Sequence, residues 1–217
     1  MFRLATAAPL ILALLAHAQT PIGAWRDHLP YRNMVDVVGG DGGVYCATAN
    51  AVFHYSSATG ETRRLSKVNL LNDVDIRGLA WCDALGMLLV HYGNGNLDLV
   101  QGGRSYNMGD IKRSSILGDK AIYRIRVDGT TAYLACGFGI VVVDLDRREV
   151  RETWLIGPGG SQVRVRAVAL TPDSVYAATH AGLFAASRAA GNLASFTNWR
   201  KRADMSPSMA NGPFTMA

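Results

Sequence analysis

Two pairs of carboxylates, each pair separated by one residue, could do acid–base or metal chemistry. They are Asp73 with Asp75 and Asp144 with Asp146. Carboxylates at this spacing can act as general acid and base or as ligands of a hard metal ion. No third ligand is recognisable beside either pair, and aspartate is frequent in turns. We therefore interpret both pairs as residues of turns and strand ends.

Residues 94–98, with the sequence NGNLD, place oxygen-bearing side chains at alternate positions, as a calcium loop does. An EF-hand loop also has a glycine at its sixth position and a glutamate at its twelfth, and both are missing here. Asn-Gly between two apolar segments is instead typical of a type I′ hairpin turn. We predict a hairpin at this place and no metal site.

Motifs of several common enzyme families are missing from the sequence. It contains no G-x-S-x-G, no H-E-x-x-H and no P-loop. Gly137 and Gly139 resemble the start of a dinucleotide-binding loop, but the third glycine is missing and an apolar strand follows where a helix is required. His54, His91 and His180 show no metal-ligand spacing. The sequence therefore weighs against an enzyme, and we expect no cofactor.

The turn before the last segment of each repeat unit described below is predicted to carry at least one arginine, and these arginines could bind anions. Guanidinium groups form bidentate contacts with phosphate and carboxylate groups. On one face of an exported protein they could hold an anionic glycan or a phosphorylated lipid head group, or they could be ordinary solvated turn residues. The positions are Arg63, Arg64, Arg104, Arg147, Arg148 and Arg188.

Two further segments are candidate interaction sites. Residues 25–32 read WRDHLPYR, a mixture of aromatic and polar groups that is enriched at interfaces but could equally pack against the rim of the fold. Residues 109–121 form the longest predicted connection and could carry a specific contact. The candidate residues in these segments are Trp25, Arg26, His28, Tyr31, Lys112 and Arg113.

The composition favours a turn-rich β protein. Of 217 residues, 49% are apolar, 18% are charged and 23 are glycine, which permits a buried core and many turns. The sequence has 3 glutamates and 4 lysines against 14 aspartates and 18 arginines, so good helix formers for surfaces are scarce. Cys46, Cys82 and Cys136 are expected to be buried strand residues, with a bridge between Cys46 and Cys136 as an alternative.

Residues 1–18 have the pattern of a signal peptide. Arg3 precedes an apolar run over residues 7–16, and Ala16-His17-Ala18 forms a small-x-small cleavage site before Gln19. The run is too short to cross a bilayer, so we expect an exported protein that is soluble or peripherally held, without a transmembrane span. The net charge of +5 is mild, and no nucleic acid is expected as a partner.

An internal repeat organises the chain. Similar segments begin at Tyr45, Leu89, Tyr133 and Tyr176, at spacings of 44, 44 and 43 residues. Each is flanked by two further apolar segments, and a shorter, more polar segment closes each unit. The closing segments are residues 61–65, 104–108, 150–155 and 196–200.

Four strands in a unit of about 44 residues are typical of a β-propeller blade. The predicted fold is all-β, with about four four-stranded blades that are part of a larger, seven-bladed propeller. Four blades rarely close a ring, so we expect the chain to be truncated. The blades are predicted at about residues 34–66, 77–108, 122–155 and 164–200, between an N-terminal segment over 19–33 and an irregular tail over 203–217.

Five longer motifs are more specific than the hairpin pattern. They are WRDHLPY at 25–31, LSKVN at 65–69, YGNGNLDL at 92–99, DIKR at 110–113 and YLACGFGIVVVDL at 133–145. Over residues 22–157 the sequence resembles the PorZ-like components of the type IX secretion system of Bacteroidetes. The resemblance implies a propeller of the two-component-regulator type in a non-enzymatic protein at the cell surface, peripheral to the outer membrane. It also implies work with the sortase that attaches cargo to anionic lipopolysaccharide, and binding of that lipopolysaccharide and of other attachment-complex proteins.

Two other functions are open at this point. Similar propellers form the periplasmic ligand-sensing part of hybrid two-component histidine kinases, which would need a membrane helix and a kinase further along the chain. A propeller glycosidase or lyase would place carboxylates or histidines at the central channel.

Overall fold

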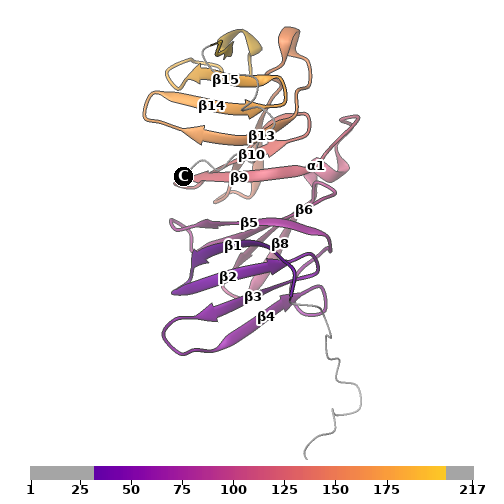
Figure 1. Cartoon of the computed structure of the whole chain (residues 1–217), viewed down its shortest axis with the longest axis vertical. Coiled ribbons are helices and arrows are strands. Elements are labelled where there is room, and N and C mark those ends of the chain that lie inside the picture. Colours follow the sequence, from indigo (N-terminus) through magenta and orange to yellow (C-terminus); the bar gives the residue numbers. More distant parts are fainter. Residues whose placement is uncertain (1–31, 204–217) are drawn as a thin grey trace, which may run out of the picture.

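The computed structural model describes residues 32–203, which form four antiparallel sheets of four strands each. Within every sheet the strands lie in the order in which they occur in the sequence. Figure 1 shows the sheets following one another along the long axis of the molecule, from the indigo first sheet to the yellow last one. Each sheet is one propeller blade, and the predicted all-β propeller fold is confirmed.

The strands of the first two blades have five to seven residues each. The first blade contains β1 (Met34–Gly40), β2 (Gly43–Thr48), β3 (Ala51–Ser56) and β4 (Thr62–Ser66). The second blade contains β5 (Ile76–Cys82), β6 (Met87–Tyr92), β7 (Leu97–Gln101) and β8 (Arg104–Met108). A single helical turn, α1 (Asp110–Arg113), follows the second blade.

The last two blades repeat this order. The third blade contains β9 (Ile122–Asp128), β10 (Thr131–Cys136), β11 (Gly139–Asp144) and β12 (Glu149–Trp154). The fourth blade contains β13 (Val165–Leu170), β14 (Ser174–Thr179), β15 (Gly182–Ser187) and β16 (Arg200–Lys201). Short 3₁₀ turns lie at Pro158–Gly160 and Phe196–Asn198.

The hydrophobic core consists of three layers, one between each pair of successive blades. Tyr45 and Val52 of the first blade pack with Leu88 and Val90 of the second. The largest layer joins the second and third blades, and a further layer joins the third and fourth. All six residues of β6 are buried, because blades cover both of its faces. This explains why its sequence, MLLVHY, is apolar over four successive positions instead of alternating.

The fourth strand that we predicted over residues 196–200 is wrong for most of its length. Phe196–Asn198 is a 3₁₀ turn, and β16 pairs with β15 through only two residues. Local hydrogen bonds explain the difference. The Asn198 Nδ2 atom donates to the Asn192 carbonyl (2.6 Å), and the Trp199 Nε1 atom donates to the Leu193 carbonyl (2.8 Å). Such bonds compete with a sheet ladder.

The turn at Asn94-Gly95 forms a hairpin, but not of the predicted type. Type I′ needs positive φ at both central residues, and of these two only Gly95 has positive φ, at 79°. The connection between β6 and β7 spans residues 93–96. The Asn94 Oδ1 atom accepts a hydrogen bond from the backbone N–H of Asn96 (3.0 Å), which stabilises this longer turn.

All three cysteines are free. Cys46 lies in β2 of the first blade and Cys136 in β10 of the third, so the alternative bridge between them is not formed. No helix among residues 32–203 has the length and apolar character needed to cross a membrane. The predicted signal peptide, the candidates Trp25, Arg26, His28 and Tyr31, and the tail after residue 203 lie outside the described residues.

Candidate interaction site

A buried carboxylate holds the loops at one end of the second blade. Asp98 on β7 is 0% exposed and accepts hydrogen bonds from Tyr92 Oη (2.6 Å), Asn107 Nδ2 (2.8 Å) and Asn72, through both its backbone N (2.7 Å) and its Nδ2 (3.0 Å). Burial of a charge is costly unless it is hydrogen-bonded, and these four donors compensate for it. Burial and the bond to Asp98 raise the pKa of the Tyr92 phenol far above its ordinary value. Asp98 thereby fixes the connection between the first two blades.

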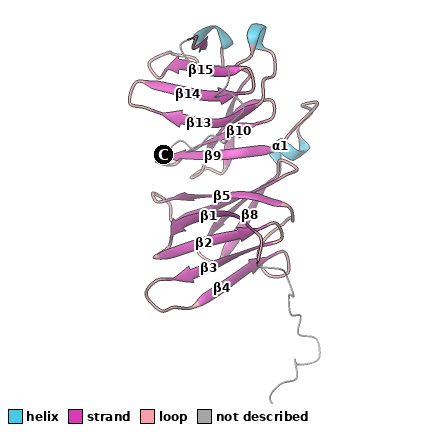
Figure 2. Ribbon diagram, viewed as in Figure 1, coloured by secondary structure: helices cyan, strands magenta, loops and turns pink. Residues whose placement is uncertain are grey.

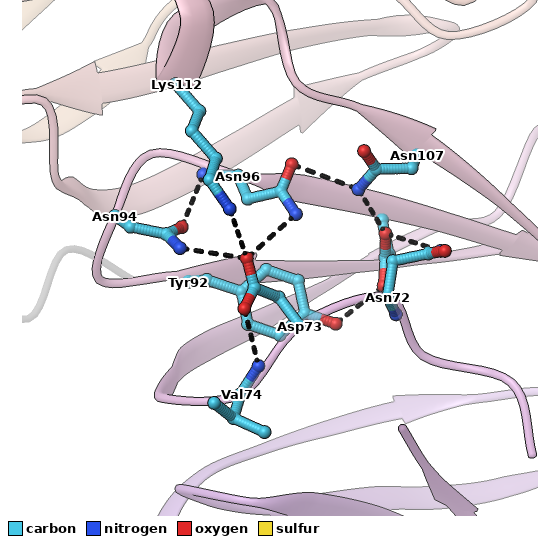
Figure 3. Close-up of polar contacts among 9 residues, drawn as sticks. Asn72, Asp73, Val74, Tyr92, Asn94, Asn96, Asn107 and Lys112 are labelled. Atoms are coloured by element: carbon cyan, nitrogen blue, oxygen red, sulfur yellow. Dashed lines mark hydrogen bonds and ion pairs between the residues drawn. The ribbon is translucent and has the colours of Figure 1, made fainter. Parts of the chain in front are cut away.

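The neighbouring Asp73 joins three loops (Figure 3). Its Oδ2 atom accepts hydrogen bonds from Asn94 Nδ2 (2.8 Å), Asn96 Nδ2 (3.2 Å) and Lys112 Nζ (2.7 Å). Its Oδ1 atom accepts one from the backbone N–H of Val74 (3.0 Å). Burial alone would raise the pKa of Asp73, but hydrogen bonds from Lys112, Asn94 and Val74 outweigh it and hold this pKa well below its ordinary value.

The Lys112 ammonium group forms an ion pair with the Asp73 carboxylate at 2.7 Å. Among residues 32–203, no three His, Cys, Asp or Glu side chains are grouped as a metal site would require. Asp144, in the second carboxylate pair, accepts hydrogen bonds from the backbone N–H groups of Asp146 (3.1 Å) and Arg147 (3.0 Å). The residues of both pairs lie in connections or at a strand end, as the sequence interpretation had it.

The connection over residues 109–121 is tethered along its length. Ile111 of α1 is buried in the core layer between the second and third blades. The Lys120 Nζ atom donates to the carbonyls of Ser114 (2.7 Å) and Lys112 (3.2 Å). Between these anchors Leu117 is 83% exposed. The loop thus presents a large apolar side chain to solvent on a constrained backbone.

Further aliphatic side chains are exposed on the connection that holds Asp73. Val68 is 64% exposed and Val74 is 44% exposed. We define the loop face as residues 67–75, 93–96 and 109–121, which the Asp73 network joins. The loop face combines exposed aliphatic groups with the exposed cations Lys112 and Arg113. Constrained apolar groups with a polar rim are typical of protein interfaces.

The predicted arginines of the first two blades lie in strands and not in turns. Arg63 and Arg64 are inside β4, and Arg104 is the first residue of β8. The Arg63 Nη2 atom is 3.8 Å from the Asp41 carboxylate, in an exposed ion pair. Because both side chains are exposed to solvent, this ion pair contributes little to the stability of the fold.

The predicted arginines of the last two blades lie after the third strand, as expected, but beside acidic or aromatic groups. Arg188 Nη2 is 2.8 Å from Asp128, an ion pair that joins the fourth blade to the third. The Arg148 guanidinium lies 3.6 Å from the centre of the Tyr106 ring, which belongs to the second blade. Arg147 Nη1 is 3.2 Å from a carboxylate oxygen of Glu149. Whether any of these arginines binds an anion stays a prediction.

Of the described candidates, Lys112 and Arg113 are the two that the structure places in the loop face. Sequence reasoning missed Asn72, Asp98 and Asn107, which build the support beneath it. Of these three, Asp98 could have been recognised from the sequence, because it is a charged residue between Leu97 and Leu99 in an otherwise apolar strand.

The protein is thus a β-propeller whose polar loops are held together at one end of the blades. A family model described as the N-terminal β-propeller domain of PorZ of the type IX secretion system matches residues 44–200. The chain belongs to this PorZ N-terminal propeller family. The match extends through the fourth blade, beyond the region over which the sequence motifs were recognised.

Solved structures show the same fold. PorZ of Porphyromonas gingivalis, described as an essential bacterial surface component of the type IX secretion system, superimposes with a TM-score of 0.68 at 24% identity over 77% of this chain. The extracellular domain of a putative hybrid two-component system from B. thetaiotaomicron gives 0.63 at 14% identity over 80% of this chain. The chain covers 22% and 24% of these two proteins. No curated protein sequence matches the chain.

Proposed function

We propose that this propeller belongs to a non-enzymatic, exported accessory protein of the type IX secretion system. In this function it assists the sortase that attaches secreted cargo to anionic lipopolysaccharide at the cell surface, by docking partner proteins and the glycolipid. The observation that carries the proposal is the family match over residues 44–200. The predicted signal peptide agrees with export.

The loop face supports a docking function. Leu117, Val68 and Val74 are exposed on loops whose backbones are fixed by buried or partly buried carboxylates. A fixed loop loses little conformational entropy when a partner binds, so more of the contact energy appears as affinity. The same loops carry Lys112 and Arg113, which suits an acidic rim on the partner.

Deletion of the gene in the source bacterium tests the proposed function. We expect cargo proteins with C-terminal sorting domains to lose their attachment to lipopolysaccharide, as seen by immunoblotting of the cell-surface fraction. The full natural gene supplied in trans should restore attachment. Unchanged attachment in the deletion strain would contradict the proposal.

A sensing propeller of a hybrid two-component system is the second candidate. The structural similarity to such an extracellular domain, at 14% identity, supports the shared fold. This function would leave cargo attachment intact in the deletion strain and would abolish a transcriptional response to an oligosaccharide. The same strain therefore separates the two functions.

A further inference from the structure

The first strand of every blade carries a β-bulge at the same place. In its pairing with the second strand, the register skips one residue: Val35 in β1, Arg77 in β5, Tyr123 in β9 and Arg166 in β13. These four strands neighbour one another in this order, as Figure 2 shows. A bulge re-aims a side chain, and bulges are enriched beside functional sites.

Three of the bulges surround a cavity of about 240 Å³. Val35, Arg77 and Tyr123 line it, together with Asp36 and Arg124, which follow two of the bulged residues. Sites for drug-sized ligands have about 300–1,000 Å³, so this cavity suits one small group. The cavity is assembled from three blades and adjoins the loop face, because Arg77 in its lining is 3.0 Å from Asp75 of the loop face.

One wall of the cavity contains a buried histidine with one ring nitrogen that has no partner among the described residues. His91 on β6 lines the cavity and is 2% exposed, and within residues 32–203 its Nδ1 atom has no hydrogen-bond partner. Buried polar atoms without partners are rare in folded proteins. Gly78 makes room for this ring, because an added Cβ would lie 2.4 Å from His91 Nε2. The imidazole can therefore lie at the cavity wall only because residue 78 has no side chain.

The charges of the lining favour an anion. Arg124 has no ion-pair partner in the described part of the chain, whereas Arg77 is 3.0 Å from Asp75. The carboxylate of Asp36 already accepts hydrogen bonds from the backbone N–H groups of Val37 (2.9 Å) and Leu79 (2.8 Å). Burial lowers the pKa of His91 to about 4, so its ring is neutral at neutral pH. The lining thus contains two guanidinium groups, of which Arg77 is paired with Asp75 and Arg124 has no ion-pair partner among residues 32–203, and one carboxylate that is already partly satisfied.

We propose that this cavity binds a small oxyanion, such as a phosphate, sulfate or carboxylate group, with Arg124 as its main ligand and Arg77 as a second cation. Guanidinium groups match the geometry of such oxyanions. The inference does not depend on the proposed secretion function, because the group can belong to a free anion or to an acidic sugar. Arg166, at the fourth bulge, adds a further guanidinium group close to the cavity, 5.8 Å from the centre of the Tyr123 ring in the cavity lining.

Isothermal titration calorimetry of the full natural protein tests this site. Inorganic phosphate, sulfate and glucuronate are titrated separately, with glucose as the neutral comparison. Arg124→Gln should weaken binding of the oxyanion at least tenfold, because a charge-assisted hydrogen bond is lost. The matched control is Arg126→Gln, since Arg126 lies on the same strand, is exposed and does not line the cavity. It should keep the affinity within about twofold.

Binding of phosphate or sulfate would assign the site to a free or ester-linked anion, and binding of glucuronate alone would assign it to a carboxylate on a sugar ring. Either result, with the difference between the two variants, supports the proposal. The proposal is overturned if none of the three anions binds, if Arg126→Gln loses as much affinity as Arg124→Gln, or if glucose binds as tightly as glucuronate. Thermal melting of both variants checks that they fold.

Discussion

At the scale of single residues, two aspartates of similar chemistry have different functions in this blade. Asp98 is fully buried and holds neutral donors, whereas Asp73 is at the surface end of the network and holds Lys112. The sequence indicated that Asp73 belongs to a turn and that Lys112 is a candidate, but it could not show that they meet, because 39 residues separate them. Contacts between loops of different blades depend on the tertiary fold, which a local pattern does not contain.

Replacement of Asp98 by asparagine tests the buried network. Asp98→Asn keeps the shape but turns one acceptor into a donor that faces the donors of Asn72 and Asn107. We expect a loss of about 3 kcal/mol in the free energy of unfolding, measured by urea denaturation. Asp146→Asn, at an exposed turn, is the control and should change it by less than about 0.5 kcal/mol. Equal stability of both variants would show that the network is not important for folding.

Protonation of His91 gives a pH dependence of stability. Its pKa is about 4 in the folded protein against 6.5 as the ordinary value, so the unfolded chain binds more protons between these values. The stabilisation is complete above pH 6.5 and falls by about 3 kcal/mol as the pH drops to about 4. Chemical denaturation at several pH values measures this slope. His91→Gln should flatten it in this window, and an unchanged slope would contradict the assignment.

At the scale of secondary-structure elements, the repeat predicted most of the fold. The strand-like segments that begin at Tyr45, Leu89, Tyr133 and Tyr176 lie in β2, β6, β10 and β14, the second strands of the four blades. The sequence did not reveal the bulges in the first strands, because a bulge changes backbone pairing without changing residue type. It also mispredicted residues 196–200, where local side-chain hydrogen bonds replace the ladder.

The packing between blades should dominate the stability of the fold. Leu89 on β6 is 0% exposed in the layer between the second and third blades. Leu89→Ala should lower the free energy of unfolding by about 3 kcal/mol, since it leaves a cavity in a packed layer. Leu117→Ala, on the exposed loop, should change it by less than about 0.5 kcal/mol. A similar small change for both variants would mean that the layers pack loosely.

At the scale of the whole molecule, the chain presents two surfaces with different chemistry. The loop face offers aliphatic groups and cations at one end of the blades, and the bulged first strands offer guanidinium groups around a cavity. One surface suits a protein partner and the other a small anion. The two surfaces meet where Arg77 of the cavity lies 3.0 Å from Asp75 of the loop face.

We propose that the loop face docks the secretion machinery, and capture of the sortase by the natural protein is the experiment that decides this. Affinity-tagged full natural protein is isolated from the source bacterium and the bound sortase is quantified by mass spectrometry. Leu117→Asp should reduce the captured sortase at least tenfold, because it replaces the most exposed aliphatic side chain of the loop face by a charged one. Ala58→Asp, in the exposed turn between β3 and β4, adds the same charge away from the loop face and should capture as much sortase as the natural protein. Equal capture by the natural protein and Leu117→Asp would show that the loop face does not dock the sortase.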